Sequence, residues 1–333
     1  MRADRVAAAP PSGGDPLASW HEGRAKQALL DFIAGVTQPS SAVFVPVGDR
    51  IAVLDADGTI WPERPAIEAH FALTRISEAA SSDPTLRERQ PYKAALEADL
   101  DALAALSARD TLDLVSTSHA CMSTDQFLDE ARAFFLSASH PTLGIPYTSA
   151  GYQPMRELTA LLLAHDFTVW VCSAGTPEFA RIRTEHFLGV PRDRVIASRP
   201  AETCRDVLGS LVIWRSPGVA FVNERDARAI AIAAQIGARP LFVAANTGGC
   251  ANTEVMRYAQ DRGGCCFPVL VHHDHPDCDV TYGDAARAGL SAAARFGFNV
   301  VSVKRDWRRV FPEAATLAGS VDDTRALDSH GKS

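Results

Sequence analysis

The chain has 333 residues, of which 47% are hydrophobic and 22% are charged, and its formal net charge is −7 at pH 7. This composition is typical of a globular protein with a large buried core. The negative net charge and the lack of a basic stretch argue against nucleic acid as a partner. No apolar run is long enough to span a bilayer, so we expect no membrane partner. The sequence defines no oligomeric state.

Both ends of the chain are expected to lie outside the folded part. Residues 1–17 are rich in Ala, Pro and Gly and lack the apolar segment of a signal peptide, which favours a disordered leader. Residues 313–333 are polar and predict a loose tail. The seven cysteines are scattered through a chain large enough to fold without disulfides, which favours reduced thiols and a cytoplasmic location.

Apolar residues at helical spacing predict a first helix over residues 16–36, and an apolar run predicts a buried strand over residues 51–54. Residues 67–136 keep three- and four-residue apolar spacing throughout, which predicts helices and no strand. Within that block the helices are expected over residues 67–80, 92–106, 111–116 and 124–136. From residue 155 onwards strands and helices alternate, which is typical of a parallel sheet with helices on both faces.

The predicted fold is therefore α/β, with a three-layer, doubly wound parallel sheet and an inserted all-helical cap. The α/β core comprises residues 18–64 and 151–312, and the helical cap comprises residues 65–150. The second core segment is expected to hold strands over residues 167–172, 195–198, 211–214, 240–244, 268–271 and 299–303, and helices over residues 155–165, 177–187, 226–236, 254–259 and 284–296.

Two carboxylates, Asp55 and Asp57, follow the first strand with a single alanine between them. Gly58 and Thr59 come next and predict a tight turn whose backbone N–H groups suit an anion. In open α/β sheets ligands bind at the carboxyl ends of the strands, so these acids are placed for chemistry. One carboxylate would attack while the other delivers a proton to a leaving group. An acidic surface turn is the alternative interpretation of this motif taken alone.

A hydroxyl stands at the end of another predicted strand, at Ser173, and is followed by Ala174, Gly175 and a helix that begins at Pro177. A serine between a strand and a helix N-terminus is a phosphate-binding arrangement. Serine and threonine are also common helix caps, so the motif has little specificity by itself.

The two acids, the serine and the helical block between them resemble the haloacid dehalogenase superfamily of phosphohydrolases. Similarity to one bacterial subgroup extends the resemblance over roughly residues 18–312 and lies in residues 20–32, 152–155, 270–273 and 303–311. The resemblance implies a phosphomonoester hydrolase that forms an aspartyl-phosphate on Asp55, with Asp57 as general acid and base. It also implies phosphate binding by Thr59, Ser173 and Ala174, and a cap that selects a small phosphorylated substrate.

The resemblance further implies Mg²⁺, held by the Asp55 carboxylate and the Asp57 backbone carbonyl. The family completes this site with carboxylates, but here Asn246 and Asn252 occupy their positions. An amide oxygen can bind Mg²⁺ but brings no charge. The substitutions leave open an enzyme with weak Mg²⁺ affinity, an enzyme that takes a carboxylate from Glu224 or Asp226, and a catalytically silent protein that binds a phosphorylated ligand or partner. We expect catalysis, because both acids and the serine are intact.

The family also places a lysine on a helix of the core, where this chain has Arg228. No lysine occurs between Lys93 and Lys304. Arginine keeps the positive charge, so we predict that Arg228 binds phosphate. A surface arginine on an amphipathic helix is the alternative.

Overall fold

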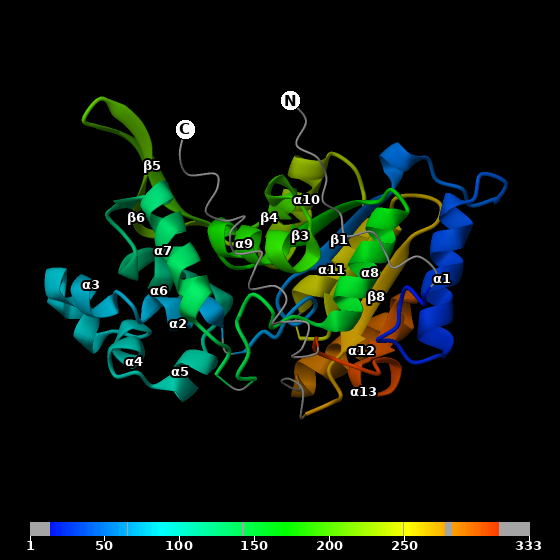
Figure 1. Ribbon diagram of the computed structural model, residues 1–333, viewed down its shortest axis with the longest axis horizontal. Coiled ribbons are helices and arrows are strands. Elements are labelled where there is room, and N and C mark those ends of the chain that lie inside the picture. Colours follow the sequence, from blue (N-terminus) through cyan, green and yellow to red (C-terminus); the bar gives the residue numbers. More distant parts are fainter. Residues whose placement is uncertain (1–13, 65, 142, 249, 277–281, 313–333) are drawn as a thin grey trace.

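In the computed structural model of the protein, an α/β core lies beside a cap (Figure 1). The structure describes residues 14–64, 66–141, 143–248, 250–276 and 282–312. Residues 1–13 of the predicted leader and the predicted tail, 313–333, lie outside the described residues. Leu17, which the sequence assigns to the leader, is fully buried in the core. Within the described residues, no helix combines the length and the apolar composition needed to cross a membrane.

The core is built on a six-stranded sheet in which all neighbouring strands are parallel, as predicted. The strand order is β4-β3-β1-β7-β8-β9, so β1 lies between β3 and β7. The strands are β1 (Ile51–Asp55), β3 (Thr168–Cys172), β4 (Val195–Ile196), β7 (Phe242–Asn246), β8 (Phe267–His272) and β9 (Asn299–Ser302). β1 is buried along its whole length, which explains its uninterrupted apolar sequence.

Helices cover both faces of this sheet and give the predicted three layers (Figure 1). Ala52 and Leu54 of β1 pack toward one face, whereas Ile51 and Val53 pack toward the other. The first face carries α1 (Arg24–Thr37) and α8 (Gln153–Ala164), and the second carries α10 (Asp226–Ile236), α11 (Cys250–Gln260) and α12 (Gly283–Phe296). Shorter or peripheral core elements are η1 (Val47–Asp49), α9 (Pro177–Leu188), η3 (Arg192–Arg194) and α13 (Val303–Asp306).

The cap, inserted after β1, is helical over most of its length and has a hydrophobic cluster of its own. Its elements are α2 (Ile67–Ala72), α3 (Ile76–Ser82), η2 (Pro84–Glu88), α4 (Tyr92–Leu96), α5 (Leu100–Ala104), α6 (Ala108–Ser118) and α7 (Thr124–Ser137). The helices expected over residues 67–80 and 92–106 are thus each divided in two. The second division contains Ala98, whose φ of 53° does not occur in a right-handed helix.

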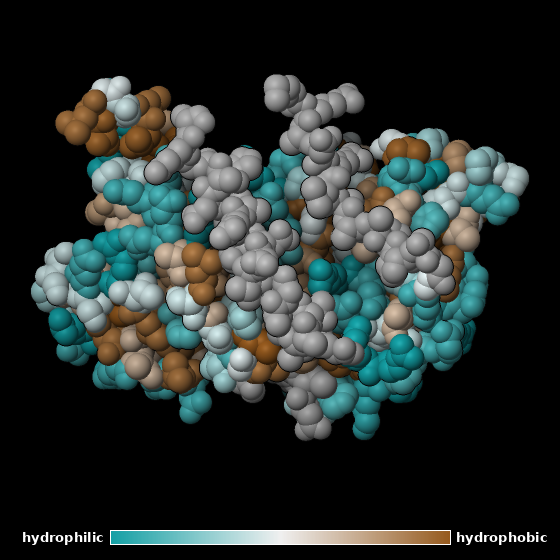
Figure 2. Space-filling model, viewed as in Figure 1, coloured by the Kyte–Doolittle hydropathy of each residue, from teal (hydrophilic) through white to brown (hydrophobic). Residues whose placement is uncertain are grey.

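A second, antiparallel sheet with the strand order β2-β6-β5 was not expected from the sequence. β2 (Met122–Ser123) belongs to the cap, so the cap is not entirely helical. β5 (Arg199–Val207) and β6 (Ser210–Phe221) form a hairpin, and the strand expected over residues 211–214 lies in this hairpin rather than in the parallel sheet. The end of the hairpin projects from the molecule and exposes apolar side chains (Figure 2), which include Val207, Leu208, Leu211 and Ile213.

One buried arginine links the hairpin to both the cap and the core. Arg215 of β6 is fully buried, and its guanidinium lies 3.7 Å from the ring centroid of Phe127 in α7. Its Nη1 atom also lies 3.5 Å from Oε2 of Glu178 in α9. A buried cation needs such compensation, so these contacts fix the hairpin against both partners.

Candidate active site

Asp55 is the last residue of β1, and the chain turns immediately after it. Gly58 in this turn has a φ of 69°, in the left-handed region that favours glycine. A Cβ atom at this position would collide with the side chains of Tyr282 and Asn246. The turn lets Asp55 and Asp57 line the same cavity.

Three side chains donate hydrogen bonds to the Asp55 carboxylate. Nη1 of Arg228, from α10, lies 2.5 Å from Oδ1. Nδ2 of Asn246, at the end of β7, lies 3.1 Å from Oδ2, and Oγ1 of Thr59 lies 3.3 Å from the same atom. Burial raises the pKa of Asp55 to about 6, although the Arg228 guanidinium acts to lower it. At neutral pH the Asp55 carboxylate is therefore ionised and anchored.

Asp57 is held by neutral donors instead. Nε1 of Trp61 lies 2.8 Å from Oδ1, and Oγ of Ser173 lies 3.4 Å from Oδ2. Ser173 follows β3 directly, and its hydroxyl accepts a hydrogen bond from the Gly175 N–H at 3.0 Å. The Ser173 carbonyl accepts from Nδ2 of the buried Asn223 at 3.0 Å. Asn223, which no motif in the sequence pointed to, thus positions the serine loop.

The two asparagines form a closed network beside these acids. Nδ2 of Asn246 donates to the Asp57 carbonyl at 2.7 Å, and its Oδ1 accepts from the Gly248 N–H at 2.5 Å. Nδ2 of Asn252 donates to the Asn246 carbonyl at 3.0 Å. Oδ1 of Asn252 accepts from Nη1 of Arg228, also at 3.0 Å. Both polar side-chain atoms of each asparagine therefore have partners.

A cavity of about 210 Å³ lies over this network, between the core and the cap. Its core side is lined by Asp55, Asp57, Ser173, Ala174, Arg228, Asn246 and Asn252. Its cap side is mainly apolar and includes Ile67, Ala104, Leu106, Ala108 and Leu112. The structure therefore brings together the residues predicted from the sequence, with one exception. Thr59 is fully buried, and its hydroxyl faces the Asp55 carboxylate rather than the cavity.

Four charged residues of the cavity wall were not identified from the sequence, namely Glu63, Arg64, Glu68 and Arg183. Glu68 of α2 accepts hydrogen bonds from the N–H and the hydroxyl of Thr176 at 2.8 and 3.1 Å, and burial raises its pKa to about 7. Arg183 of α9 stacks over Trp61 at 4.1 Å, and burial lowers its pKa to about 10. In the sequence Glu68 and Arg183 are each one charged residue on a helix, so only the packing of α2 and α9 around the cavity reveals their position.

The family model of haloacid dehalogenase-like hydrolases matches residues 52–245, more than half of the chain. The chain belongs to this family. The resemblance inferred from the motifs is thereby confirmed. A search of the curated proteins finds no match to this haloacid dehalogenase-like hydrolase.

Several solved structures are similar to this hydrolase at low identity. A Bordetella pertussis protein of unknown function is 13% identical, covers 76% of this chain and 97% of its own, and gives a TM-score of 0.44. A phosphoserine phosphohydrolase-like protein of Francisella tularensis is 14% identical, with coverages of 82% and 99% and a TM-score of 0.39. A probable phosphoserine phosphatase of Vibrio cholerae is 15% identical, with coverages of 74% and 66% and a TM-score of 0.35. The family assignment rests on the sequence match.

The side chains do not fit the Mg²⁺ site that the family resemblance implies. The amide nitrogen of Asn246, and not its oxygen, faces the Asp55 carboxylate and the Asp57 carbonyl, so a cation there would meet N–H groups. The Asn252 oxygen is engaged by the Arg228 guanidinium, itself a cation. Within the residues that the structure describes, no three His, Cys, Asp or Glu side chains gather in a metal-binding group. The predicted ligand set of Asp55, Asp57, Asn246 and Asn252 is therefore not supported by the arrangement of its side chains.

A carboxylate from elsewhere does not complete that set. Glu224 lines the cavity, and its charge interacts with that of the Arg228 guanidinium. Among the described residues, it does not belong to a group of His, Cys, Asp or Glu side chains that could hold a metal ion. Asp226 is exposed at the start of α10.

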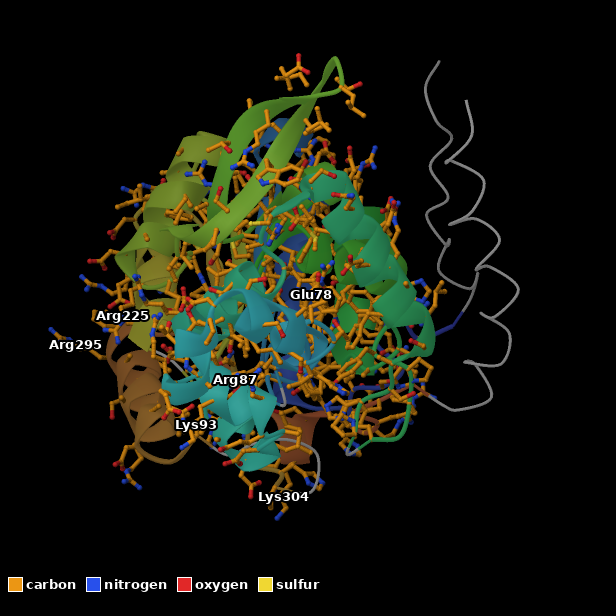
Figure 3. All side chains as sticks on the ribbon, turned by 90° about the vertical axis from the view of Figure 1, so that its left-hand side faces the viewer. Glu78, Arg87, Lys93, Arg225, Arg295 and Lys304 are labelled. Atoms are coloured by element: carbon orange, nitrogen blue, oxygen red, sulfur yellow. The ribbon has the colours of Figure 1, made fainter. Side chains whose placement is uncertain are left out.

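The positive charge at Asp55 comes from Arg228, which is only 7% exposed, so it is not a surface arginine. The described lysines lie elsewhere. Lys93 and Lys304 are at the periphery of the molecule (Figure 3). Lys26 forms ion pairs beside the start of α1.

Proposed function

We propose that this protein is a phosphomonoester hydrolase with Asp55 as the nucleophile and Asp57 as the general acid and base. The observation that carries the proposal is the contrast between the two carboxylates in one cavity. Asp55 is anchored by the Arg228 guanidinium, whereas Asp57 accepts only from the neutral donors Trp61 and Ser173 among the hydrogen bonds of the described residues. A pair of carboxylates in different environments is how one site supports both acid and base roles.

In the first half-reaction an Asp55 oxygen attacks phosphorus, and the bond from phosphorus to the leaving oxygen breaks. Asp57 gives its proton to that oxygen, so the product leaves as an alcohol. In the second half-reaction a water molecule attacks the aspartyl-phosphate while Asp57 accepts its proton, which releases inorganic phosphate and regenerates the Asp55 carboxylate. Arg228, Ser173 and Ala174 line the cavity, and in this proposal the guanidinium, the Ser173 hydroxyl and the Ala174 backbone stabilise the phosphoryl oxygens.

The cap defines what kind of leaving group fits. The cap side of the cavity is apolar at Ile67, Leu106 and Leu112, and charged groups reach the cavity from Glu68 of the cap and Arg183 of the core. With a volume of about 210 Å³, the cavity favours a small phosphorylated substrate whose leaving group is mainly apolar with one polar or charged substituent.

Turnover of two phosphomonoesters by matched variants tests this proposal. With an alkyl phosphate, Asp55→Asn is expected to abolish turnover and Asp57→Asn to reduce it by about 10² to 10⁴, because the alkoxide needs a proton to leave. With p-nitrophenyl phosphate, whose leaving group needs no acid, Asp57→Asn is expected to retain the first step and to accumulate phosphoenzyme that mass spectrometry detects. Asp49→Asn, in the exposed η1, is the control. Assays are run both in EDTA and in MgCl2.

Equal turnover by wild type and Asp55→Asn would overturn the proposal. Tight binding of inorganic phosphate or of phosphate esters without turnover under any condition would instead support the alternative, a catalytically silent member of the family that binds a phosphorylated ligand or partner.

A further inference from the structure

The amide nitrogen of Asn246 lies among three oxygens that surround one point of the site. It is 2.7 Å from the Asp57 carbonyl, 3.1 Å from Oδ2 of Asp55 and 3.4 Å from Oγ1 of Thr59. Carboxylate, carbonyl and hydroxyl oxygens are also the ligands that a hard divalent cation takes. The amide thus fills the position of a cation with hydrogen-bond donors.

The surroundings of Asn246 fix which way its amide points. The Gly248 N–H donates to Oδ1 at 2.5 Å. If the amide were rotated by 180°, its NH₂ group would face the Gly248 N–H, and its oxygen would face the Asp55 carboxylate and the Asp57 carbonyl. Both sets of contacts would then be repulsive. The backbone at Gly248 therefore disfavours the orientation that a bound cation requires.

The two asparagines compensate in charge for the absence of a cation. Arg228 is buried, and its Nη1 atom lies 2.5 Å from Oδ1 of Asp55 and 3.0 Å from Oδ1 of Asn252. The family pattern has carboxylates where this chain has Asn246 and Asn252. Loss of two negative charges together with one dication leaves the total charge unchanged. A site that had merely lost its ligands would leave buried polar atoms unpaired, but both amides are satisfied.

We infer that Asn246 and Arg228 take the place of a divalent cation, so that the site binds phosphate without one. Both side chains line the same cavity as Asp55, so we expect a phosphate bound beside Asp55 to meet them. The inference concerns binding in the site and holds whether or not the bound ester is hydrolysed.

Thermal unfolding and phosphate binding measure this directly. Wild type, Asn246→Asp/Asn252→Asp and the control Asn299→Asp are unfolded in EDTA and in rising MgCl2, with NaCl added to equal ionic strength. Affinity for inorganic phosphate is measured by calorimetry under the same conditions. For wild type we expect no Mg²⁺-dependent rise in Tm and the same phosphate affinity with and without Mg²⁺. For the double variant we expect a lower Tm in EDTA and a saturable rise with Mg²⁺.

A saturable rise of the wild-type Tm with Mg²⁺, or phosphate binding that requires Mg²⁺, would overturn the inference. A double variant that responds to Mg²⁺ no more than Asn299→Asp would overturn it as well. If the double variant does not fold, the wild-type measurements alone decide. Wild-type turnover that appears only with Mg²⁺ would reject this inference and support the proposed hydrolase. Phosphate binding that needs no metal, without any turnover, would support this inference and reject the proposed hydrolase.

Discussion

Replacement of Glu68 by glutamine is expected to stabilise the protein at and above neutral pH. The Glu68 carboxyl is 6% exposed, and its Oε1 accepts two hydrogen bonds from Thr176. Its Oε2 has no hydrogen-bond partner among the described residues. Burial is the largest cause that raises its pKa from 4.5 to about 7, and the charges of Asp57 and Glu178 add to it. Glutamine keeps an acceptor for Thr176 and removes the buried charge.

The size of the effect follows from the two pKa values. In the unfolded chain Glu68 loses its proton near pH 4.5, whereas in the folded protein it does so near pH 7. Between these values the unfolded state binds fewer protons, so the ionisation of Glu68 lowers the free energy of unfolding as the pH rises. At about 1.4 kcal/mol for each pH unit, the loss is about 3 kcal/mol and is complete above about pH 8.

Urea denaturation of wild type and Glu68→Gln between pH 4.5 and pH 9 measures this loss. We expect the free energy of unfolding of the variant, relative to wild type, to rise by about 3 kcal/mol in total over that range, with no further change above about pH 8. Glu88→Gln, at an exposed position of η2, should follow wild type at every pH. A difference between Glu68→Gln and wild type that does not vary with pH, or that shrinks as the pH rises, would refute the assignment of a buried, raised-pKa carboxyl.

Three further predictions concern charged groups of the site and the hairpin. In a pH–rate profile, kcat/KM of wild type should fall as the pH drops through about 6, because protonated Asp55 cannot attack. Arg228→Lys should show the same fall, because it keeps the positive charge beside Asp55. Arg228→Met should show the fall at higher pH, because it removes that charge. Arg215→Met should destabilise the protein by about 3 to 5 kcal/mol in urea, and a second change, Glu178→Gln, should recover most of that loss. The affinity for inorganic phosphate, measured by calorimetry, should fall about tenfold more above pH 7 in wild type than in Glu68→Gln. An equal fall in both proteins would contradict the placement of this carboxylate beside the phosphate.

Most of the core was predictable because its elements carry local signals. The helix expected over residues 226–236 has those bounds in the structure, and Gly237, with a φ of 74°, ends it in the left-handed conformation typical of a glycine after a helix. The hairpin had no such signal. Its turn places Leu208 and Gly209 at φ values of 53° and 85°, a geometry that usually selects asparagine before glycine. With leucine there, the turn does not show in the sequence.

The convergence of the site residues was also predictable, because the carboxyl ends of neighbouring parallel strands meet at one edge of a sheet. Asp55 ends β1, Ser173 follows β3 and Asn246 ends β7, and these three strands are adjacent. Sequence gives no information on which way an amide points. The orientation of the Asn246 amide depends on the N–H group of Gly248. This orientation determines whether the amide oxygen can bind a cation or the amide nitrogen takes the cation's position.

The charge balance of the cavity explains why protonation and phosphate binding should be linked. The acidic groups that line the cavity outnumber the basic ones: Asp55, Asp57, Glu63, Glu68 and Glu224 face Arg64, Arg183 and Arg228. A phosphate brings further negative charge into a cavity lined by protein, where repulsion is stronger than in bulk water. The pKa of Glu68 lies near neutrality, so it can bind a proton when the anion enters, and the general acid must carry one for the first half-reaction. Asn246 and Asn252 contribute no carboxylates. The positive charge of the arginines and of any bound proton is therefore offset by fewer acids, and more of it is available to neutralise the phosphate than in a site with two more acids.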